Sequence, residues 1–370
     1  MKKYMFIALA SLATLAACSK VNVADTDADR AISFQVARYQ STKADPADYK
    51  DNYAGVPFGA YAWFKGVSAA DNADFMVNQK VSYDKAQDAW LPDGTTYYWP
   101  KSGSIDFICY SPYSADTKVI AVAEDKIAFT GYTAAADDLM YADKAVGLSG
   151  NKETYYYNGV PVLFRHALAR VSFQIKAAYL QKTAADGDVT KWEITVNSAT
   201  VKDVRTTGDL ALTLDGTSWK LPESKVWTPA EARKDLTLDA KELGVLTAEA
   251  KPMGESCYVL PQALSLGQQI LLNITIKTYR DTGEGFQLVL SETGIEVAGR
   301  LDAAQLPQWG INQDITYTLV IAPTGSKGTD PKDPEKPVDP NNPVLNDAVI
   351  TFDPAVTDWE TVTVNTTISL

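Results

Sequence analysis

The sequence predicts an all-β protein made of two β-sandwich domains. Short segments of alternating apolar and polar residues follow one another along the chain, separated by clusters of Gly, Asp, Asn, Ser and Pro. Such alternation is typical of strands with one buried face. Windows with the period of an amphipathic helix are missing, which argues against parallel βαβ units. The length of 370 residues suggests two domains rather than one.

Residues 1–17 have the pattern of a secretory signal peptide. Lys2 and Lys3 precede an apolar run that is too short to span a bilayer of about 30 Å. The run ends in Leu-Ala-Ala-Cys, a bacterial lipobox, so we expect Cys18 to be lipidated and to begin the mature chain. The alternative is an ordinary signal peptide with a chance cysteine. No later segment is long and apolar enough to cross a membrane, so the lipid would anchor the chain to it.

The N-terminal sandwich is expected over residues 31–160, after an acidic leader at 18–30. It opens with ISFQVAR, which places Ile32, Phe34 and Val36 on one face. Further strand patterns are FGAYAWF, TTYYWP, SIDFICYSPY and KIAFTGY. The polar, glycine-containing stretch 145–159 marks the domain boundary. Residue identities show no internal repeat between the two halves.

The C-terminal sandwich is expected over residues 161–324. Its strand patterns are VPVLFRH, ARVSFQIKA, KWEITVNSATVKDV, DLALTLDGTSWK, ESCYVLPQ, QILLNITIKTY, FQLVLSE and DITYTLVIAP. They have the same short length and turn spacing as the first half, which is typical of sandwiches.

Residues 325–346 form a proline-rich linker in which proline recurs at every third position. That period matches one turn of polyproline II, an extended rod with a solvated backbone. The linker could reach on the order of 60 Å at ~3.1 Å per residue. A PxxP ligand is the alternative, but outside a cell a spacer is favoured.

The tail strands, residues 347–370, follow this linker. ITFDPAV contributes Ile350, Phe352 and Val356, and TVTVNTTISL alternates cleanly. The apolar face of the second segment includes Val362, Val364, Ile368 and Leu370. A strand pattern this far beyond the second domain raises the question of which sheet it completes.

Composition narrows the class of protein. The formal net charge of −12 argues against binding to nucleic acid or to anionic surfaces. Cys109 and Cys257 lie in separate strand-like runs and are interpreted as two buried thiols rather than a disulfide.

Signals of an enzyme are weak, and we expect no catalytic residue, cofactor or metal. The chain has a single histidine, His166, and lacks GxSxG, HExxH and phosphate-loop patterns. DTDAD at 25–29 begins like a calcium loop, but Arg30 and Val36 stand where Gly and Glu are needed. His166 could act as a lone acid or base, but its strand-like setting favours a structural role. Tyr97–Trp99 and Tyr155–Tyr157 could stack on sugars, but packing in a sandwich is favoured.

Several motifs follow one another in a recognisable order: the lipobox, ISFQVAR with STKA, VPFGAYAWF, TTYYWPKSGSIDFICYSPY, DDLMYA, VPVLFRHALARVSFQI and ITFDPAVTDW. Over almost the whole chain the sequence resembles the fimbrillin family, the lipoprotein-precursor pilins of Bacteroidetes type V pili and their minor-subunit relatives. The resemblance implies two sandwiches of transthyretin-like or immunoglobulin-like type and a structural, adhesive role at the outer membrane and cell surface.

The resemblance also implies how subunits assemble. In the family a trypsin-like protease cuts after a basic residue in the loop that follows the first strand. Removal of that strand opens a groove, and the C-terminal strands of a neighbouring subunit fill it. Here Ile32, Phe34 and Val36 would belong to the removable edge strand, leaving an apolar groove and unpaired backbone groups. The tail residues Ile350, Phe352, Val356, Val362, Val364, Ile368 and Leu370 would form the donor. Because the contact is head-to-tail, it propagates into an open filament.

Two departures from the family pattern leave alternatives open. The usual processing arginine is replaced by Lys43 in STKA, with Arg38 as the other candidate. The long linker could free the tail for a neighbour, or the tail could fold back on its own domain, as in a tip or anchor subunit.

The alternative function is a surface glycan-binding lipoprotein, which an exposed row of coplanar aromatics would favour. Expected partners are other pilin subunits, the maturation protease, the membrane through Cys18, and a host or glycan ligand.

Overall fold

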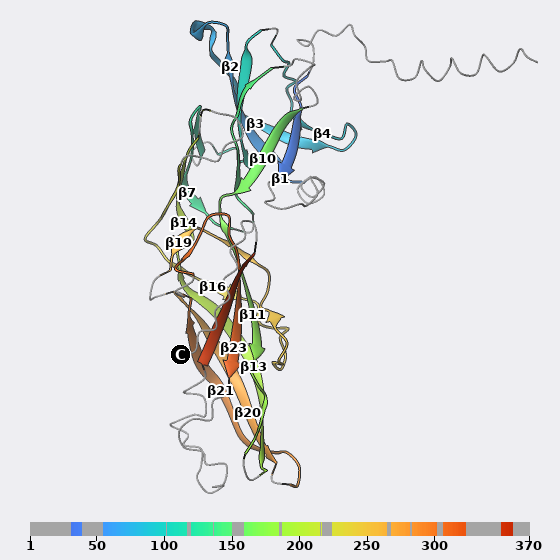
Figure 1. The fold of residues 1–370 in the computed structure, drawn as a ribbon, viewed down its shortest axis with the longest axis vertical. Coiled ribbons are helices and arrows are strands. Elements are labelled where there is room, and N and C mark those ends of the chain that lie inside the picture. The colour runs from blue at the N-terminus through green and yellow to red at the C-terminus, as the bar shows by residue number, and fades with distance from the viewer. Residues whose placement is uncertain are drawn as a thin grey trace, which may run out of the picture.

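The structure, a computed structural model, describes thirteen segments of the chain. They are residues 31–38, 55–100, 102–116, 120–135, 137–149, 159–184, 187–214, 216, 224–264, 268–281, 283–301, 306–322 and 349–357, with the backbone alone for 35–38 and 349–357. Apart from one 3-10 turn, η2 (Ala69–Asp71), the elements in these segments are strands. They lie in two groups along the long axis of an elongated molecule (Figure 1). In the same segments, no helix is long and apolar enough to span a bilayer.

The N-terminal domain is a sheet that closes on itself. Its strands are β1 (Phe34–Arg38), β2 (Phe58–Lys65), β3 (Ala73–Asp84), β4 (Ala89–Pro92), β5 (Ser104–Ser111), β8 (Met140–Ala142), β9 (Ala145–Leu148) and β10 (Val160–His166). Neighbours follow the order β2-β3-β4-β1-β10-β8-β5-β9, and β5 also pairs with β2. Seven strands therefore form a ring around one core, where the sequence predicted a sandwich without specifying this closure.

The C-terminal domain has two facing sheets. One has the order β17 (Lys251–Pro252), β11 (Ala169–Ala177), β23 (Asp314–Ala322), β24 (Val349–Thr357), with β18 (Cys257–Val259) also on β11. The other has the order β12 (Gln181–Thr183), β13 (Val189–Val204), β20 (Gln269–Asp281), β21 (Gln287–Arg300), with β16 (Lys234–Leu238) also on β13. A short pair, β19 (Gln262–Ala263) and β22 (Gln308–Trp309), lies beside them. Alternate residues of β11, β13, β20 and β23 point into a single core between the sheets.

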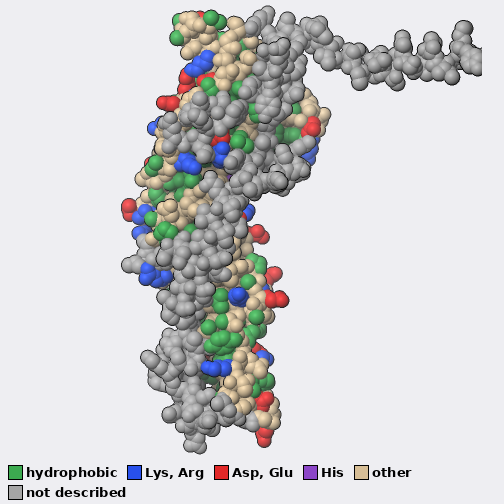
Figure 2. Space-filling model, viewed as in Figure 1, with side chains coloured by type: hydrophobic (Ala, Val, Ile, Leu, Met, Phe, Trp, Pro, Cys, Tyr) green, Lys and Arg blue, Asp and Glu red, His purple; other side chains and the backbone are tan. Residues whose placement is uncertain are grey.

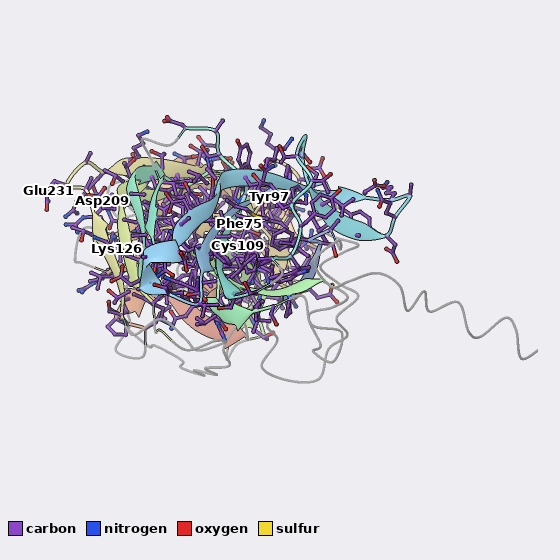
Figure 3. The ribbon with its side chains drawn as sticks, turned by 90° about the horizontal axis from the view of Figure 1, so that it is seen from above. Phe75, Tyr97, Cys109, Lys126, Asp209 and Glu231 are labelled. Atoms are coloured by element: carbon purple, nitrogen blue, oxygen red, sulfur yellow. The ribbon has the colours of Figure 1, made fainter. Side chains whose placement is uncertain are left out.

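A third sheet joins the two halves of the chain. Its order is β15 (Ser224–Pro229), β14 (Thr207–Thr213), β7 (Lys126–Thr133), β6 (Ile120–Ala123), so hairpins from both halves pair through β7 and β14. Lys126 and Asp209 mark this sheet at one side of the molecule in Figure 3. The boundary expected near residue 160 shifts to Ala167–Leu168, because β10 belongs to the ring and β11 to the second domain.

The strand β5 explains why SIDFICYS is a nearly continuous apolar run rather than an alternating one. Ile105, Phe107 and Cys109 face the core of the ring. Ile108 and Tyr110 face the core beneath the shared sheet. Because both faces are covered, both must be apolar, as in any strand buried on two sides.

Gly59 of β2 lies so close to Tyr110 of β5 that a larger residue cannot fit there without strain. A Cβ atom there would lie 2.2 Å from Cε1 of Tyr110. Tyr110 is fixed, since its hydroxyl donates to Asn78 Oδ1 at 2.6 Å and accepts from the Ser114 N–H at 3.2 Å. We expect Gly59→Ala to lower the free energy of unfolding by about 1–3 kcal/mol.

Urea denaturation of the uncut subunit measures this loss. Gly55→Ala is the matched control, because no atom lies within 4 Å of the added Cβ. Equal midpoints for the two variants would contradict the prediction.

Candidate assembly site

The first strand lies inside the ring rather than at an edge. Its backbone pairs in parallel with β10, from Phe34 opposite Val160 to Arg38 opposite Phe164. On its other side Phe34 pairs with Trp90 of β4. The expected edge strand is therefore an interior strand. Removing it would break the ring between β4 and β10 and leave backbone groups of β10 unpaired.

The side chains of this strand fill the core of the ring. Ile32 is 1% exposed and Phe34 is 2% exposed. The Phe34 ring contacts Phe58 edge-on at 5.5 Å between centroids and Phe107 at 5.8 Å. The N–H of Ile32 donates to the Tyr97 carbonyl at 2.7 Å. Removal of the strand would thus leave two adjacent apolar slots, one for each side chain.

The remaining residues predicted around this strand are only partly described. Val36 and Arg38 are in β1, where the backbone alone is described. Arg38 is the last residue of the strand, and its backbone pairs with Phe164. Lys43 and Cys18 lie outside the described residues.

The first tail strand pairs with its own domain. β24 runs antiparallel to β23, from Val349 opposite Ala322 to Thr357 opposite Asp314, and forms the edge of its sheet. Ile350, Phe352 and Val356 belong to this strand, described here by its backbone. Val362, Val364, Ile368 and Leu370 lie outside the described residues.

This pairing changes the interpretation of the proline-rich linker. Ala322 and Val349 are strand partners, so residues 323–348 begin and end at neighbouring positions on the same sheet. With β24 in place the segment connects two paired strands. Of the two alternatives that the sequence left open, this pairing of residues 349–357 corresponds to a tail that folds back on its own domain.

Buried ion pairs fix β10, the strand beside β1. Arg165 donates from Nε and Nη2 to the two carboxylate oxygens of Asp143 at 2.6 and 2.7 Å. His166 is buried and contacts the Asp138 carboxylate through Nδ1. The structural interpretation of His166 agrees with this burial. The Arg165–Asp143 pair was missed because VLFRH and YADK carry no local sign of pairing.

Of the aromatic residues proposed as a sugar platform, the three that the structure describes, Tyr97–Trp99, do not form an exposed row. Trp99 is buried against Phe107. Tyr97 packs on Phe75 at 5.5 Å, and the two lie next to each other in Figure 3. Tyr98 is 53% exposed, and Phe286, far from it in the second domain, is the other exposed aromatic side chain of the described part. Tyr155–Tyr157 lie outside the described residues.

Neither described cysteine has the features of a reactive thiol. Both are free, with Cys109 buried and Cys257 half-buried. Burial raises the pKa of each thiol above its ordinary value, which disfavours the nucleophilic thiolate. Among the described residues, no group of three or more His, Cys, Asp or Glu side chains is placed to hold a metal ion. In Figure 2 basic and acidic side chains are interspersed along the described part of the visible face.

Comparison with known proteins gives a consistent result. A model of a family described as fimbrillin-like matches residues 42–337. The crystal structure of a fimbrial protein from Bacteroides vulgatus is similar with a TM-score of 0.55 and 15% identity, covering 90% of this chain and 100% of that one. A candidate cell adhesion protein from Bacteroides uniformis has a TM-score of 0.46 and 17% identity, covering 89% and 99%. At 15% identity, the likeness to the Bacteroides vulgatus protein shows the fold alone. No curated protein matches the chain.

Proposed function

Because the chain belongs to the fimbrillin-like family, we propose that it is a structural subunit of an adhesive pilus assembled by protease-triggered donor-strand exchange. The observation that carries the proposal is the place of β1. It is an interior strand of a closed ring, and its buried side chains occupy slots in the ring core. Such a strand can be replaced only by another strand of matching side chains, which is recognition by β-augmentation.

The groove left by β1 would be strongly apolar. Phe58, Phe107 and Trp90, each nearly inaccessible in the intact ring, would line it. Filling each slot again with an apolar side chain contributes roughly 1.5–3 kcal/mol. The strand ladder to β10 adds to this, so the joint between subunits would be very stable.

Cleavage at Lys43 fits this geometry better than cleavage at Arg38. A protease binds its substrate as an extended chain with free backbone on both sides of the bond. The Arg38 backbone is paired with Phe164 at the end of β1, whereas Lys43 is five positions farther along the chain. A trypsin-like enzyme accepts either residue type.

The wider assignment follows from the same proposal. The exported precursor is anchored to the outer membrane through lipidated Cys18, and the cut releases it for assembly with further pilin subunits at the cell surface. Its role is structural and not catalytic. The tail, residues 347–370, supplies the donor strand.

Limited trypsin treatment of the purified chain lacking residues 1–18 tests the function. We expect one early cut, mapped by mass spectrometry to Lys43, followed by an SDS-resistant ladder on an unboiled gel. Lys43→Gln should prevent the cut and the ladder, and Arg38→Gln is the matched control that should leave both unchanged. A cut without a ladder, or a resistant monomer, would contradict strand exchange and direct the next measurement to sugar binding.

A further inference from the structure

A short repeat links the first strand to the tail. Residues 32–37 read Ile-Ser-Phe-Gln-Val-Ala and residues 350–355 read Ile-Thr-Phe-Asp-Pro-Ala. Ile, Phe and Ala recur at the same spacing, and Ser is matched by Thr. Ile32, two residues before β1, and Phe34, the first residue of β1, are the side chains that fill the two slots of the ring core. The tail therefore carries a copy of the residues that cleavage would remove.

The order of the repeat sets the direction of the donor. β1 runs parallel to β10, and Ile precedes Phe in both segments. A donor that places Ile350 in the slot of Ile32 and Phe352 in the slot of Phe34 must therefore also run parallel to β10.

The mismatch that affects the backbone, Pro354 in place of Val36, is tolerated; the other, Asp353 in place of Gln35, exchanges one polar side chain for another. The N–H of Val160 donates to the Ser33 carbonyl at 2.7 Å, so Ser33 directs its backbone groups toward β10. Backbone groups alternate in direction along a strand, so Gln35 and Ala37 share this side while Val36 faces away from β10. A proline at that position removes no hydrogen bond to β10.

Exchange changes the pairing of the segment. In its own subunit β24 is an edge strand that pairs with β23 at nine positions. In the place of β1 it would lie between β10 and β4, which pair with β1 at five positions and at one position. The backbone ladder gains nothing, so the driving force for insertion is the burial of Ile350 and Phe352 in the two apolar slots.

Release from β23 also moves the point at which the tail leaves the domain. Thr357 pairs with Asp314 beside the domain junction, whereas Ala322 lies at the far end of β23, about 26 Å away at ~3.3 Å per residue. With β24 released, the tail leaves from Ala322, at the end of β23 that points away from the junction. Residues 323–348 then act as the extended spacer that reaches the next subunit.

We propose that Ile350–Ala355 of one copy takes the place of Ile32–Ala37 in the next, in the same direction, with Phe352 in the slot of Phe34. This rests on the proposed strand exchange and assigns its register. The segment around Val362–Leu370 is then not the one that fills these two slots.

Full-length chains cut by trypsin test the register. We expect Phe352→Ala to slow formation of the SDS-resistant dimer by about 100-fold or more. Val226→Ala removes an exposed apolar side chain of β15, outside both segments, and is the control, expected to stay within about threefold of wild type. A Phe352→Ala ladder as fast as wild type would overturn the register. Absence of a wild-type ladder would instead overturn the proposed function.

Mixing separates a lost donor from a misfolded chain. A Phe352→Ala chain that folds keeps its groove, so it can accept a donor strand but cannot supply a good one. Wild-type ladders grown in its presence should therefore stop after one variant copy is added. Failure of the variant to cap them would show that it no longer folds. In that case Phe352→Leu, which keeps an apolar side chain, becomes the test. It must assemble faster than Phe352→Ala, or the register is wrong.

Cross-linking tests the direction. Ala37 pairs with Leu163, so Ala355→Cys with Leu163→Cys in a Cys257→Ser background should form a disulfide between copies in the ladder. Val349→Cys with Leu163→Cys would link only if the donor ran in the opposite direction. Linkage of the second pair and not the first would refute the parallel arrangement.

Discussion

Replacement of Phe34 by alanine is expected to lower the free energy of unfolding of the uncut subunit by about 3–5 kcal/mol. The side chain is almost fully buried, and its ring lies edge-on against Phe58 and Phe107. The surrounding strands belong to a closed ring, which limits how far they can collapse into the cavity. Urea denaturation of the uncut chain measures the loss. Tyr98→Ala, at an exposed position whose backbone pairs with Ala31 just before the strand, should change stability by less than about 0.5 kcal/mol.

The same substitution should have no effect after assembly. In the proposed exchange the protease removes β1, so that Phe34 would no longer be part of the subunit and the donor would fill its slot. Polymers grown from Phe34→Ala chains should therefore resist SDS and heat as wild-type polymers do. A lasting loss of polymer stability would mean that β1 stays in the ring, which contradicts strand exchange.

The strands were predictable because their signal is local. β11 alternates buried and half-buried residues along its whole length, as ARVSFQIKA suggested. Ring closure was not predictable, because it depends on β2 meeting β5 and on β1 lying between β4 and β10. These pairings join segments far apart in the chain, and alternation alone does not identify a partner.

The tail shows the same limit. Its strand pattern was visible in the sequence, but the pairing of β24 with β23 came from the structure. The proline period predicted an extended segment, not that its ends would meet at Ala322 and Val349. The repeat between residues 32–37 and 350–355 is also present in the sequence. It covers only six residues, so it does not stand out when the two halves of the chain are compared.

The Arg165–Asp143 pair gives the second large effect. We expect Asp143→Ala to lower the free energy of unfolding by about 3–5 kcal/mol, because it leaves the buried Arg165 guanidinium without its carboxylate. The double variant Arg165→Met with Asp143→Leu removes both charges and should be close to wild type in stability. Asp235→Ala breaks an exposed pair with Lys202 and should leave the stability close to that of wild type.

The consequence for assembly follows from the position of this pair. If β1 leaves as proposed, β10 keeps β8 as its paired neighbour through Phe164, Arg165 and His166, with one more hydrogen bond from the Asp143 N–H to the Leu163 carbonyl. The bidentate contact then holds the wall of the empty groove. The double variant should therefore fold when it is uncut. After the cut, its amides at residues 163–166 should lose protection from hydrogen exchange, and it should accept donor strands more slowly than wild type. Unchanged exchange and unchanged assembly in that variant would show that the strand pairing alone keeps the groove open.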